Sequence, residues 1–169
     1  MTIRPARAND FDGIWTIFRA VIEAGDTYVF APDTPPDVAR DYFLGRDMQS
    51  WVAEDDGRIV GVYKLIANHR DRGSHVSNAS FMVHPDAHGR GVGRAMGEHC
   101  LEQARKAGYL AMQFNFVVST NTAAVDLWKK LGFTIVGTLP RTFNHKTLGL
   151  VDAYVMHRFL SLLLVALLL

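Results

Sequence analysis

The residues of this sequence that are best suited to chemistry form a glycine-rich segment in the middle of the chain. The segment runs His88-Gly89-Arg90-Gly91-Val92-Gly93-Arg94 and follows a predicted strand that ends in a proline turn at Pro85. Glycines let the backbone approach a ligand closely, and the first turn of a helix offers free amide hydrogens and a positive dipole end to an anion. Because Arg90 and Arg94 add positive charge, the segment predicts a binding site for a diphosphate.

The spacing excludes two common phosphate-binding loops. A Walker loop needs Gly-Lys-Ser/Thr where this chain has Gly93-Arg94-Ala95. A dinucleotide-binding loop needs Gly-x-Gly-x-x-Gly early in a βαβ unit, and here Gly97 comes one residue too late in a segment that lies mid-chain. A glycine-rich turn without a ligand stays as an alternative, although three glycines at a helix start cost stability.

The glycine-rich segment resembles the acetyl-CoA-binding motif of the GNAT acetyltransferase superfamily, Arg/Gln-x-x-Gly-x-Gly/Ala, with His88 at its first position. A second stretch, 121–133, is similar to the superfamily's second signature, Asn-x-x-Ala-x-x-Leu-Tyr-x-x-Leu-Gly-Phe, with Trp128 in place of the tyrosine. The resemblance covers nearly the whole chain. It implies an N-acetyltransferase that uses acetyl-CoA as co-substrate and a small-molecule amine as partner, with no metal.

The resemblance also implies which residues bind the donor. Main-chain groups of Met82 and Val83 are expected to pair with the pantetheine arm, and the amides of 88–94 to hold the diphosphate. Asn121 is expected to hydrogen-bond the arm or the thioester region, and as an alternative or in addition to cap a helix. The residues expected to bind acetyl-CoA are therefore Met82, Val83, His88, Gly89, Arg90, Gly91, Val92, Gly93, Arg94 and Asn121.

Acetyl transfer to an amine requires a neutral nucleophile, hydrogen-bond donors for the developing oxyanion and a route for the thiolate to leave. Trp128 cannot act as the acid that the usual tyrosine provides, so we expect it to pack. A thiol pKa of about 8.5 makes the thiolate a tolerable leaving group without an acid. We therefore expect catalysis mainly by positioning, with the Val83 amide as oxyanion donor. No single base stands out among Glu54, His75, His84 and Asp152.

Two asparagines interrupt runs of strand-forming residues. Asn78 and Asn115 are unusual because asparagine is depleted in strands and a buried amide needs hydrogen-bond partners. Their surroundings resemble the acetyltransferases that detoxify the proline analogue azetidine-2-carboxylate. That resemblance implies a small cyclic amino acid as acceptor, Asn78 and Asn115 in substrate binding or catalysis, and Tyr28 with Phe30 as an apolar wall.

Other acceptors and one non-catalytic function remain open. Phosphinothricin-type and other amino-acid or amine acetyltransferases are the nearest alternative. A protein N-acetyltransferase would require a peptide groove, which a sequence does not reveal. A CoA-sensing module without turnover is also compatible with the chain, because Trp128 replaces the usual acid.

The elements that must position these residues follow from periodicity and turn residues. The pattern predicts an α/β (α+β) chain with the order β-α-α-β-β-β-α-β-α-β-β, which in the GNAT fold forms a central mixed, mostly antiparallel sheet of about seven strands flanked by helices. The predicted strands are 2–7, 51–54, 59–66, 75–84, 109–118, 133–137 and 151–159, and a polar loop around 144–146 precedes the last of them. The first predicted helix begins at Asn9 or Asp10 and ends at Gly25. The other predicted helices span 36–48, 91–106 and 121–131.

Composition places the chain among globular proteins. It has 169 residues, 49% of them hydrophobic and 21% charged, and a net charge of +1, which gives no nucleic-acid footprint. We therefore expect a single N-acetyltransferase domain over 1–158. Cys100, the single cysteine, excludes an internal disulfide, is expected to be a buried core thiol and fits a cytoplasmic location.

The apolar end of the chain, 159–169, is expected to extend the last strand. Its eleven residues are too few for a bilayer span, which needs about twenty. We expect it to pack on the domain or on a partner subunit, which leaves a homodimer open.

Overall fold

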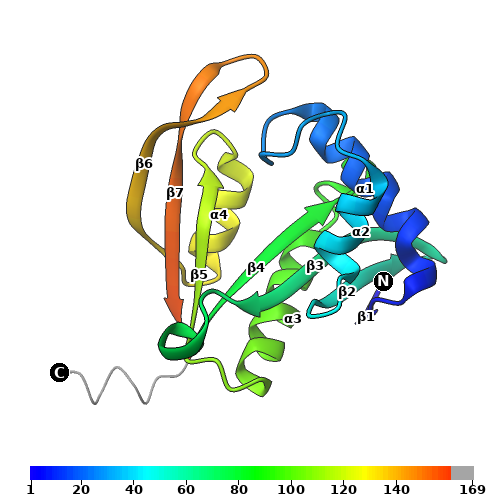
Figure 1. The fold of residues 1–169 in the computed structure, drawn as a ribbon, viewed down its shortest axis with the longest axis horizontal. Coiled ribbons are helices and arrows are strands. Elements are labelled where there is room, and N and C mark those ends of the chain that lie inside the picture. The colour runs from blue at the N-terminus through cyan, green and yellow to red at the C-terminus, as the bar shows by residue number, and fades with distance from the viewer. Residues whose placement is uncertain (161–169) are drawn as a thin grey trace. The chain divides into compact units, whose positions relative to one another are not determined.

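The computed structural model describes residues 1–160. Four helices and seven strands follow one another in the predicted order (Figure 1). The helices are α1 (Phe11–Ala24), α2 (Pro36–Leu44), α3 (Val92–Lys106) and α4 (Thr122–Lys130). The strands are β1 (Thr2–Pro5), β2 (Gln49–Asp55), β3 (Arg58–Ala67), β4 (Val76–Val83), β5 (Ala111–Val118), β6 (Thr134–His145) and β7 (Gly149–Phe159).

The strands form one sheet in the order β1-β2-β3-β4-β5-β7-β6. Strands β4 and β5 are parallel, whereas β1–β2, β5–β7 and β6–β7 pair antiparallel. The predicted α+β class and the mixed, mostly antiparallel sheet are therefore confirmed. Within this fold the chain divides into two compact units: unit 1 comprises 1–64 and 80–97, and unit 2 comprises 65–79 and the chain from Glu98 onward.

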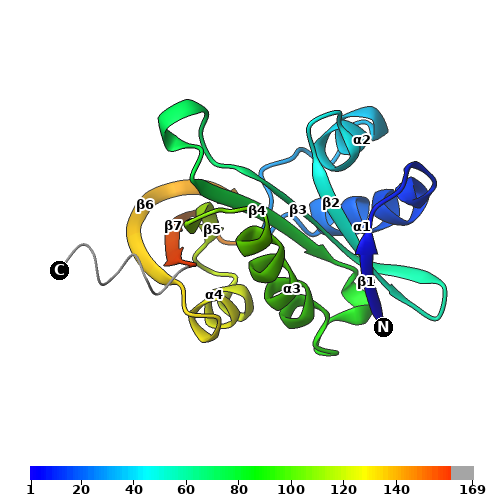
Figure 2. The same cartoon turned by 90° about the horizontal axis from the view of Figure 1, so that it is seen from below.

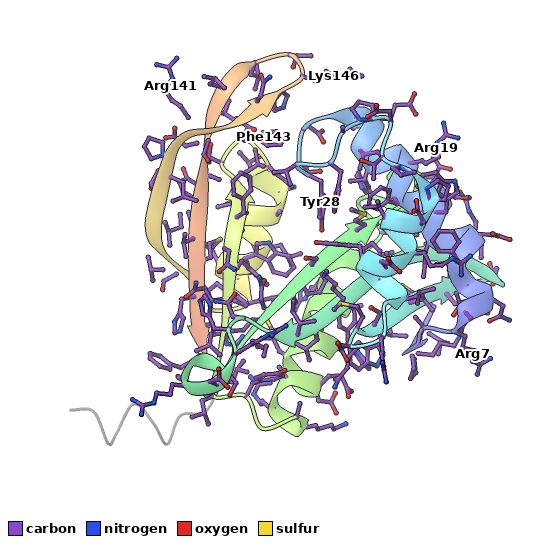
Figure 3. All side chains as sticks on the ribbon, viewed as in Figure 1. Arg7, Arg19, Tyr28, Arg141, Phe143 and Lys146 are labelled. Atoms are coloured by element: carbon purple, nitrogen blue, oxygen red, sulfur yellow. The ribbon has the colours of Figure 1, made fainter. Side chains whose placement is uncertain are left out.

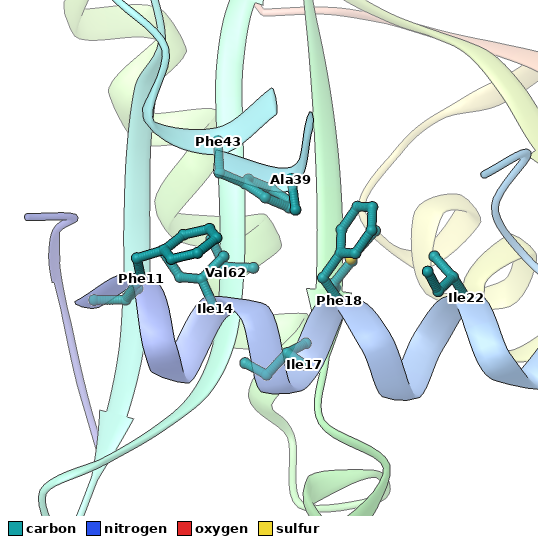
Figure 4. Close-up of a cluster of buried hydrophobic side chains, with 10 residues drawn as sticks. Phe11, Ile14, Ile17, Phe18, Ile22, Ala39, Phe43 and Val62 are labelled. Atoms are coloured by element: carbon teal, nitrogen blue, oxygen red, sulfur yellow. The ribbon is translucent and has the colours of Figure 1, made fainter. Parts of the chain in front are cut away.

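The core of unit 1 forms because α1 carries apolar side chains at helical spacing. Its inward residues meet Ala39 and Phe43 of α2 and strand residues such as Val62 (Figure 4). Gly61, the neighbouring strand residue, faces the other way and lies against Val92 and Met96 of α3. Helices α1 and α2 thus cover one side of β3, and the start of α3 covers the opposite side (Figure 2).

Turn residues set the ends of these elements, and α2 stops before Gly45, four residues short of the predicted 36–48. Gly25 takes the left-handed conformation, with φ of 65°, and ends α1. Asp56 and Gly57 both have positive φ and form the two-residue turn between β2 and β3. Asp10 stands at the start of α1, but its carboxylate accepts hydrogen bonds from the Arg4 guanidinium and the Arg7 N–H rather than from the helix.

In unit 2, α4 packs on β5 through aromatic rings. The ring centroids of Phe114 and Trp128 are 4.7 Å apart, and Phe114 stacks on Phe133 at 4.5 Å. Cys100 is buried in α3, as predicted, and burial raises the pKa of its thiol, so it is an unreactive core residue.

Strand β6 is longer than predicted. Instead of ending at Gly137 it continues to His145, so Asn144 and His145 belong to the strand and not to a loop. The pairing with β7 shifts between Leu139 and Phe143, where Arg141 has φ of 51° and donates its N–H to Asp152 Oδ1. Strand pairing resumes after this irregularity, and the hairpin tip carries Lys146 (Figure 3). The pattern of strand-forming residues in the sequence is interrupted at this irregularity. Pairing with β7 nevertheless keeps β6 extended on both sides of it.

The C-terminal prediction is only partly covered by the described residues. Phe159 ends β7, and Leu160 is buried, with its N–H bonded to the Leu110 carbonyl. The rest of the predicted apolar extension, 161–169, lies outside the described residues. None of the helices within 1–160 has the length and apolar content that a membrane crossing requires.

Candidate functional site

The glycine-rich segment connects β4 to α3 within unit 1. A short 3-10 turn (Pro85–Ala87) leads into it, and α3 begins at Val92. Gly89 and Gly91 have φ of 72° and 80°, a conformation that favours glycine. A Cβ built on either residue meets no atom within 4 Å. The backbone therefore borders open space directly at the start of a 15-residue helix, where amide hydrogens and the helix dipole attract an anion.

Successive residues of β4 alternate in the direction of their main-chain N–H and C=O groups, toward β3 or away from it. The His84 N–H donates to the Val60 carbonyl at 2.9 Å, and the Asn68 N–H donates to the Val76 carbonyl at 2.8 Å. In this antiparallel register the even-numbered residues of β4 point their N–H and C=O groups toward β3, and the odd-numbered residues point theirs away. The main chain of Met82 therefore faces β3, while that of Val83 points away from β3.

Two side chains contact main-chain carbonyl oxygens on the side of β4 that points away from β3. The His88 ring lies with Nε2 3.2 Å from the Val83 oxygen, and the Tyr28 hydroxyl donates to the Phe81 oxygen at 2.7 Å. His88 thus contacts the main chain that the sequence assigns to donor binding. The N–H of Val83 also points away from β3.

Of the two arginines expected to serve the anion, Arg90 has a carboxylate partner. The Arg90 guanidinium forms an ion pair with Asp55 at 2.5 Å, and Asp55 also pairs with the N-terminal ammonium group. These contacts hold the pKa of Asp55 below its usual value. Arg94 is exposed on the first turn of α3. The positive charge of Arg90 is therefore partly neutralised.

The predicted apolar wall is an aromatic cluster in unit 1. The rings of Tyr28 and Phe30 stack 6.3 Å apart, and Phe30 meets Tyr42 edge-on at 5.0 Å. Tyr28 lies on the segment that follows α1 (Figure 3). Burial raises the pKa of Tyr28, and nearby Tyr42 raises it further, so the phenol stays neutral.

One residue of this cluster was missed by the sequence reasoning. Lys64 of β3 is buried against the Tyr42 ring, with Nζ 3.2 Å from the ring centroid. The sequence carried a signal for it, because Val60, Val62 and Ile66 occupy the same strand face and make a lysine there exceptional.

The predicted asparagines belong to unit 2. Asn121 begins α4 and accepts the Ala124 N–H at 3.2 Å, so its expected capping role is confirmed. Asn78 is half-buried on β4. Asn115 is exposed, donates to Asn68 Oδ1 at 2.7 Å and accepts from Gln113 at 2.8 Å.

Asn115 also lies at an irregularity of β5. Phe114 pairs with Met156 and Val117 pairs with Tyr154, so two residues of β5 face one residue of β7. This is a β-bulge, a feature that redirects side chains and interrupts pairing. The bulge and the two neighbouring amides fix the orientation of the Asn115 side chain.

Trp128 packs in the interior of unit 2, as predicted, and is 7% exposed. Three of the candidate bases have partners of their own. Glu54 pairs with Arg4, His84 contacts Arg58, and Asp152 accepts the Arg141 N–H, whereas His75 is an exposed residue before β4. Within 1–160, no group of three or more His, Cys, Asp or Glu side chains is arranged to hold a metal ion.

Comparisons with known proteins add to this geometry. A family model described as "Acetyltransferase (GNAT) family" matches residues 16–133. The solved structure of a GCN5-related N-acetyltransferase from Kribbella flavida has a TM-score of 0.89 and 41% identity, over 94% of this chain and 96% of that one. Two further structures of this fold, at 24% identity, contain acetyl-CoA.

Curated relatives match at lower identity. The N-acetyltransferase aca1 of Schizosaccharomyces pombe is 33% identical over 100 residues, which is 57% of this chain and 47% of the relative. The chain thus spans about half or less of the first curated relatives that it matches. A phosphinothricin N-acetyltransferase of Alcaligenes faecalis is 28% identical over 95% of this chain and 83% of its own length.

Proposed function

Because the chain belongs to the acetyltransferase (GNAT) family, we propose that it transfers the acetyl group of acetyl-CoA to the amine of a small free amino acid or a close analogue. The observation that carries this proposal is the backbone at Gly89 and Gly91. Both residues have positive φ and border open space at the start of α3, which suits the diphosphate of the donor.

The proposed donor site uses main-chain groups more than side chains. The amides of 88–94 are proposed to bind the diphosphate, except those of His88 and Arg90, whose N–H groups already donate to the Pro85 and Ala87 carbonyls at 3.1 and 3.4 Å. The N–H of Val83 points away from β3 and serves the carbonyl oxygen of the thioester. Met82 supports this strand from the core, since its side chain is buried and its main chain faces β3. Asn121 is proposed to contact the pantetheine arm in addition to capping α4.

The proposed reaction is direct transfer. The neutral amine of the acceptor attacks the thioester carbon, a C–N bond forms, and the C–S bond breaks as the thiolate of CoA leaves. The amine proton passes to solvent. The Val83 N–H stabilises the oxyanion while it exists. No acid is required at Trp128, because a thiol with a pKa of about 8.5 leaves as thiolate near neutral pH.

For the acceptor we propose a small amino acid, as the name of the phosphinothricin-acetylating relative suggests. Tyr28 and Phe30 provide an apolar wall in unit 1, and Asn78 and Asn115 of unit 2 are proposed to act on the acceptor. A cyclic amino acid such as azetidine-2-carboxylate is the finer proposal, with detoxification as its use. The buried Cys100 thiol fits the cytoplasmic location that we propose with it.

The test is a thiol-release assay with acetyl-CoA and a panel of acceptors. The panel holds proteinogenic amino acids, azetidine-2-carboxylate, phosphinothricin, a polyamine and a peptide with a free N-terminus. We expect thiol release with at least one free amino acid and an N-acetylated product in the mass spectrum. Release with the peptide alone would instead identify a protein N-acetyltransferase. Thermal stabilisation by acetyl-CoA without release from any acceptor would identify a CoA-sensing module.

A further inference from the structure

Lys64 is a buried cation that the fold does not explain. It lies in the middle of β3, and its residue is only 7% exposed. The register fixed by the His84–Val60 and Asn68–Val76 hydrogen bonds places Lys64 opposite Ser80 of β4. The ammonium nitrogen lies 3.2 Å from the centroid of the Tyr42 ring.

No carboxylate compensates this charge. Among the residues that the structure describes, none forms an ion pair with Lys64, and burial lowers its pKa to about 8, so it is mainly protonated at pH 7. The phenols of Tyr28 and Tyr42 have pKa values raised by burial and stay neutral. A cation–π contact offsets only part of the cost of removing an ammonium group from water. An anion beside the Lys64 ammonium group would therefore stabilise it, and the described residues do not provide one.

The ammonium nitrogen of Lys64 is not completely enclosed by protein atoms. Within 1–160, every fully buried side-chain nitrogen or oxygen has a hydrogen-bond partner. Because Lys64 forms a contact with the Tyr42 ring and no such hydrogen bond, its nitrogen keeps some exposure to solvent.

The surroundings of Lys64 form a rigid aromatic support. The Tyr42 hydroxyl donates to Ser80 Oγ at 2.7 Å, and its ring meets Phe30 and Phe43 edge-on. Phe30 in turn stacks with Tyr28. The cation thus stands beside the aromatic residues assigned to the acceptor wall, all within unit 1.

We propose that the ammonium group of Lys64 binds the carboxylate of the amino-acid acceptor and makes the enzyme select free amino acids over amines that lack a carboxylate. This assignment rests on the proposed function. The carboxylate completes the charge pair that the buried lysine lacks, while the aromatic wall takes the apolar part of the acceptor. Lys64 is thus a specificity-determining residue.

The first experiment uses the wild-type protein. Acetylation of the best amino acid of the acceptor panel is compared with acetylation of its α-carboxamide, which keeps the amine and removes the negative charge. We expect kcat/KM to be about tenfold to a hundredfold higher for the acid, as for a hydrogen bond to a charged group. Equal values would overturn the assignment. A protein that acetylates no free amino acid at all would contradict the proposed function itself, and the assignment with it.

The second experiment uses Lys64→Met, which keeps the length of the side chain and removes the charge. We expect KM for the acid to rise about tenfold or more, with little change for the carboxamide or for acetyl-CoA affinity. Lys64→Arg should recover part of the loss, and Lys129→Met, at an exposed position of α4, should change nothing. An equal loss of kcat with both acceptors would make Lys64 a general base instead and overturn the assignment, as would an unchanged KM for the acid. If the Met variant does not fold, the wild-type comparison decides alone.

Discussion

At the scale of single residues, the proposed donor site depends on the backbone of Gly89 and Gly91, and the proposed acceptor site on the side chains of Asn115 and Lys64. The positive φ of Gly89 and Gly91 and the capping by Asn121 agree with what their types and spacing predict. The partners of Asn115 come from distant positions in the chain or from a strand neighbour, and no local pattern encodes them. Lys64 differs from them, because a lysine among the apolar residues of one strand face is visible in the sequence, whereas its contact with the Tyr42 ring is set by tertiary structure.

The cost of burying Lys64 predicts a pH-dependent stability difference. The folded-state pKa of about 8 lies below the usual lysine value of about 10.4, so the unfolded chain binds more protons between these values and wild-type stability rises with pH there. Below pH 8 the full penalty applies. Without ligand, we expect Lys64→Met to raise Tm by about 2–4 °C at pH 7, and this advantage to shrink as pH rises from 8 toward 10.4. Thermal unfolding followed by circular dichroism measures this. A gain that is independent of pH, or a lower Tm at pH 7, would contradict the account of the buried charge.

The proposed action of Asn115 on the acceptor predicts a selective kinetic loss. We expect Asn115→Ala to lower kcat with the best amino acid about tenfold or more, while the Kd of acetyl-CoA stays the same. Steady-state kinetics and calorimetric titration provide the two readouts. Asn144→Ala, at another exposed asparagine of a strand, is the matched control and should behave as wild type. If Asn115→Ala turned over at the wild-type rate, its assigned role would be wrong.

At the scale of elements, the predicted helices and strands agree with the observed ones in order and in most of their bounds, but the helix predicted over 36–48 ends at Leu44 and β6 is longer than predicted. The helical spacing and the closing Gly25 predict α1, and the strands predicted over 51–54 and 59–66 are joined by the tight turn at Asp56-Gly57. The extension of β6 beyond Gly137 was not predicted, because β7 stabilises it across an irregularity. Elements whose ends are set by local residues can therefore be predicted from the sequence. The length of a strand that depends on pairing with a distant strand cannot.

A substitution in the loop between β4 and α3 is predicted to weaken the binding of acetyl-CoA with only a small loss of folding stability. A Cβ at Gly91 meets no protein atom, so Gly91→Glu costs only the strain of a positive φ, about 1–2 kcal/mol. Its bulk and negative charge would occupy the diphosphate position, and we expect the Kd of acetyl-CoA to rise at least a hundredfold. Gly108→Glu is the matched control, since Gly108 also has positive φ and open space. Calorimetric titration that found wild-type affinity in the Gly91 variant would rule out the proposed cradle.

At the scale of the whole molecule, the chain has one sheet and two compact units. Strand β4 belongs to both, since its first half lies in unit 2 and its second half in unit 1. We propose that 1–158 nevertheless act as one domain, because breaking either unit would break this shared strand. Sequence length and composition favour this interpretation, whereas the division into two units has no signal in the sequence.

The single-domain proposal predicts one cooperative unfolding transition. Differential scanning calorimetry should give a calorimetric enthalpy equal to the van't Hoff enthalpy. Acetyl-CoA at a hundred times its Kd should shift the whole transition upward, by about 2.7 kcal/mol of stability. Two separate transitions, or a shift of only part of the heat absorption, would show that the units unfold independently.

The most direct test of the central claim is a crystal structure of the protein with CoA bound. We predict that the diphosphate oxygens lie within hydrogen-bond distance of main-chain N–H groups in 88–94, with the pantetheine arm along the side of β4 that points away from β3. CoA bound elsewhere, with side chains instead of these amides around its phosphates, would contradict the account.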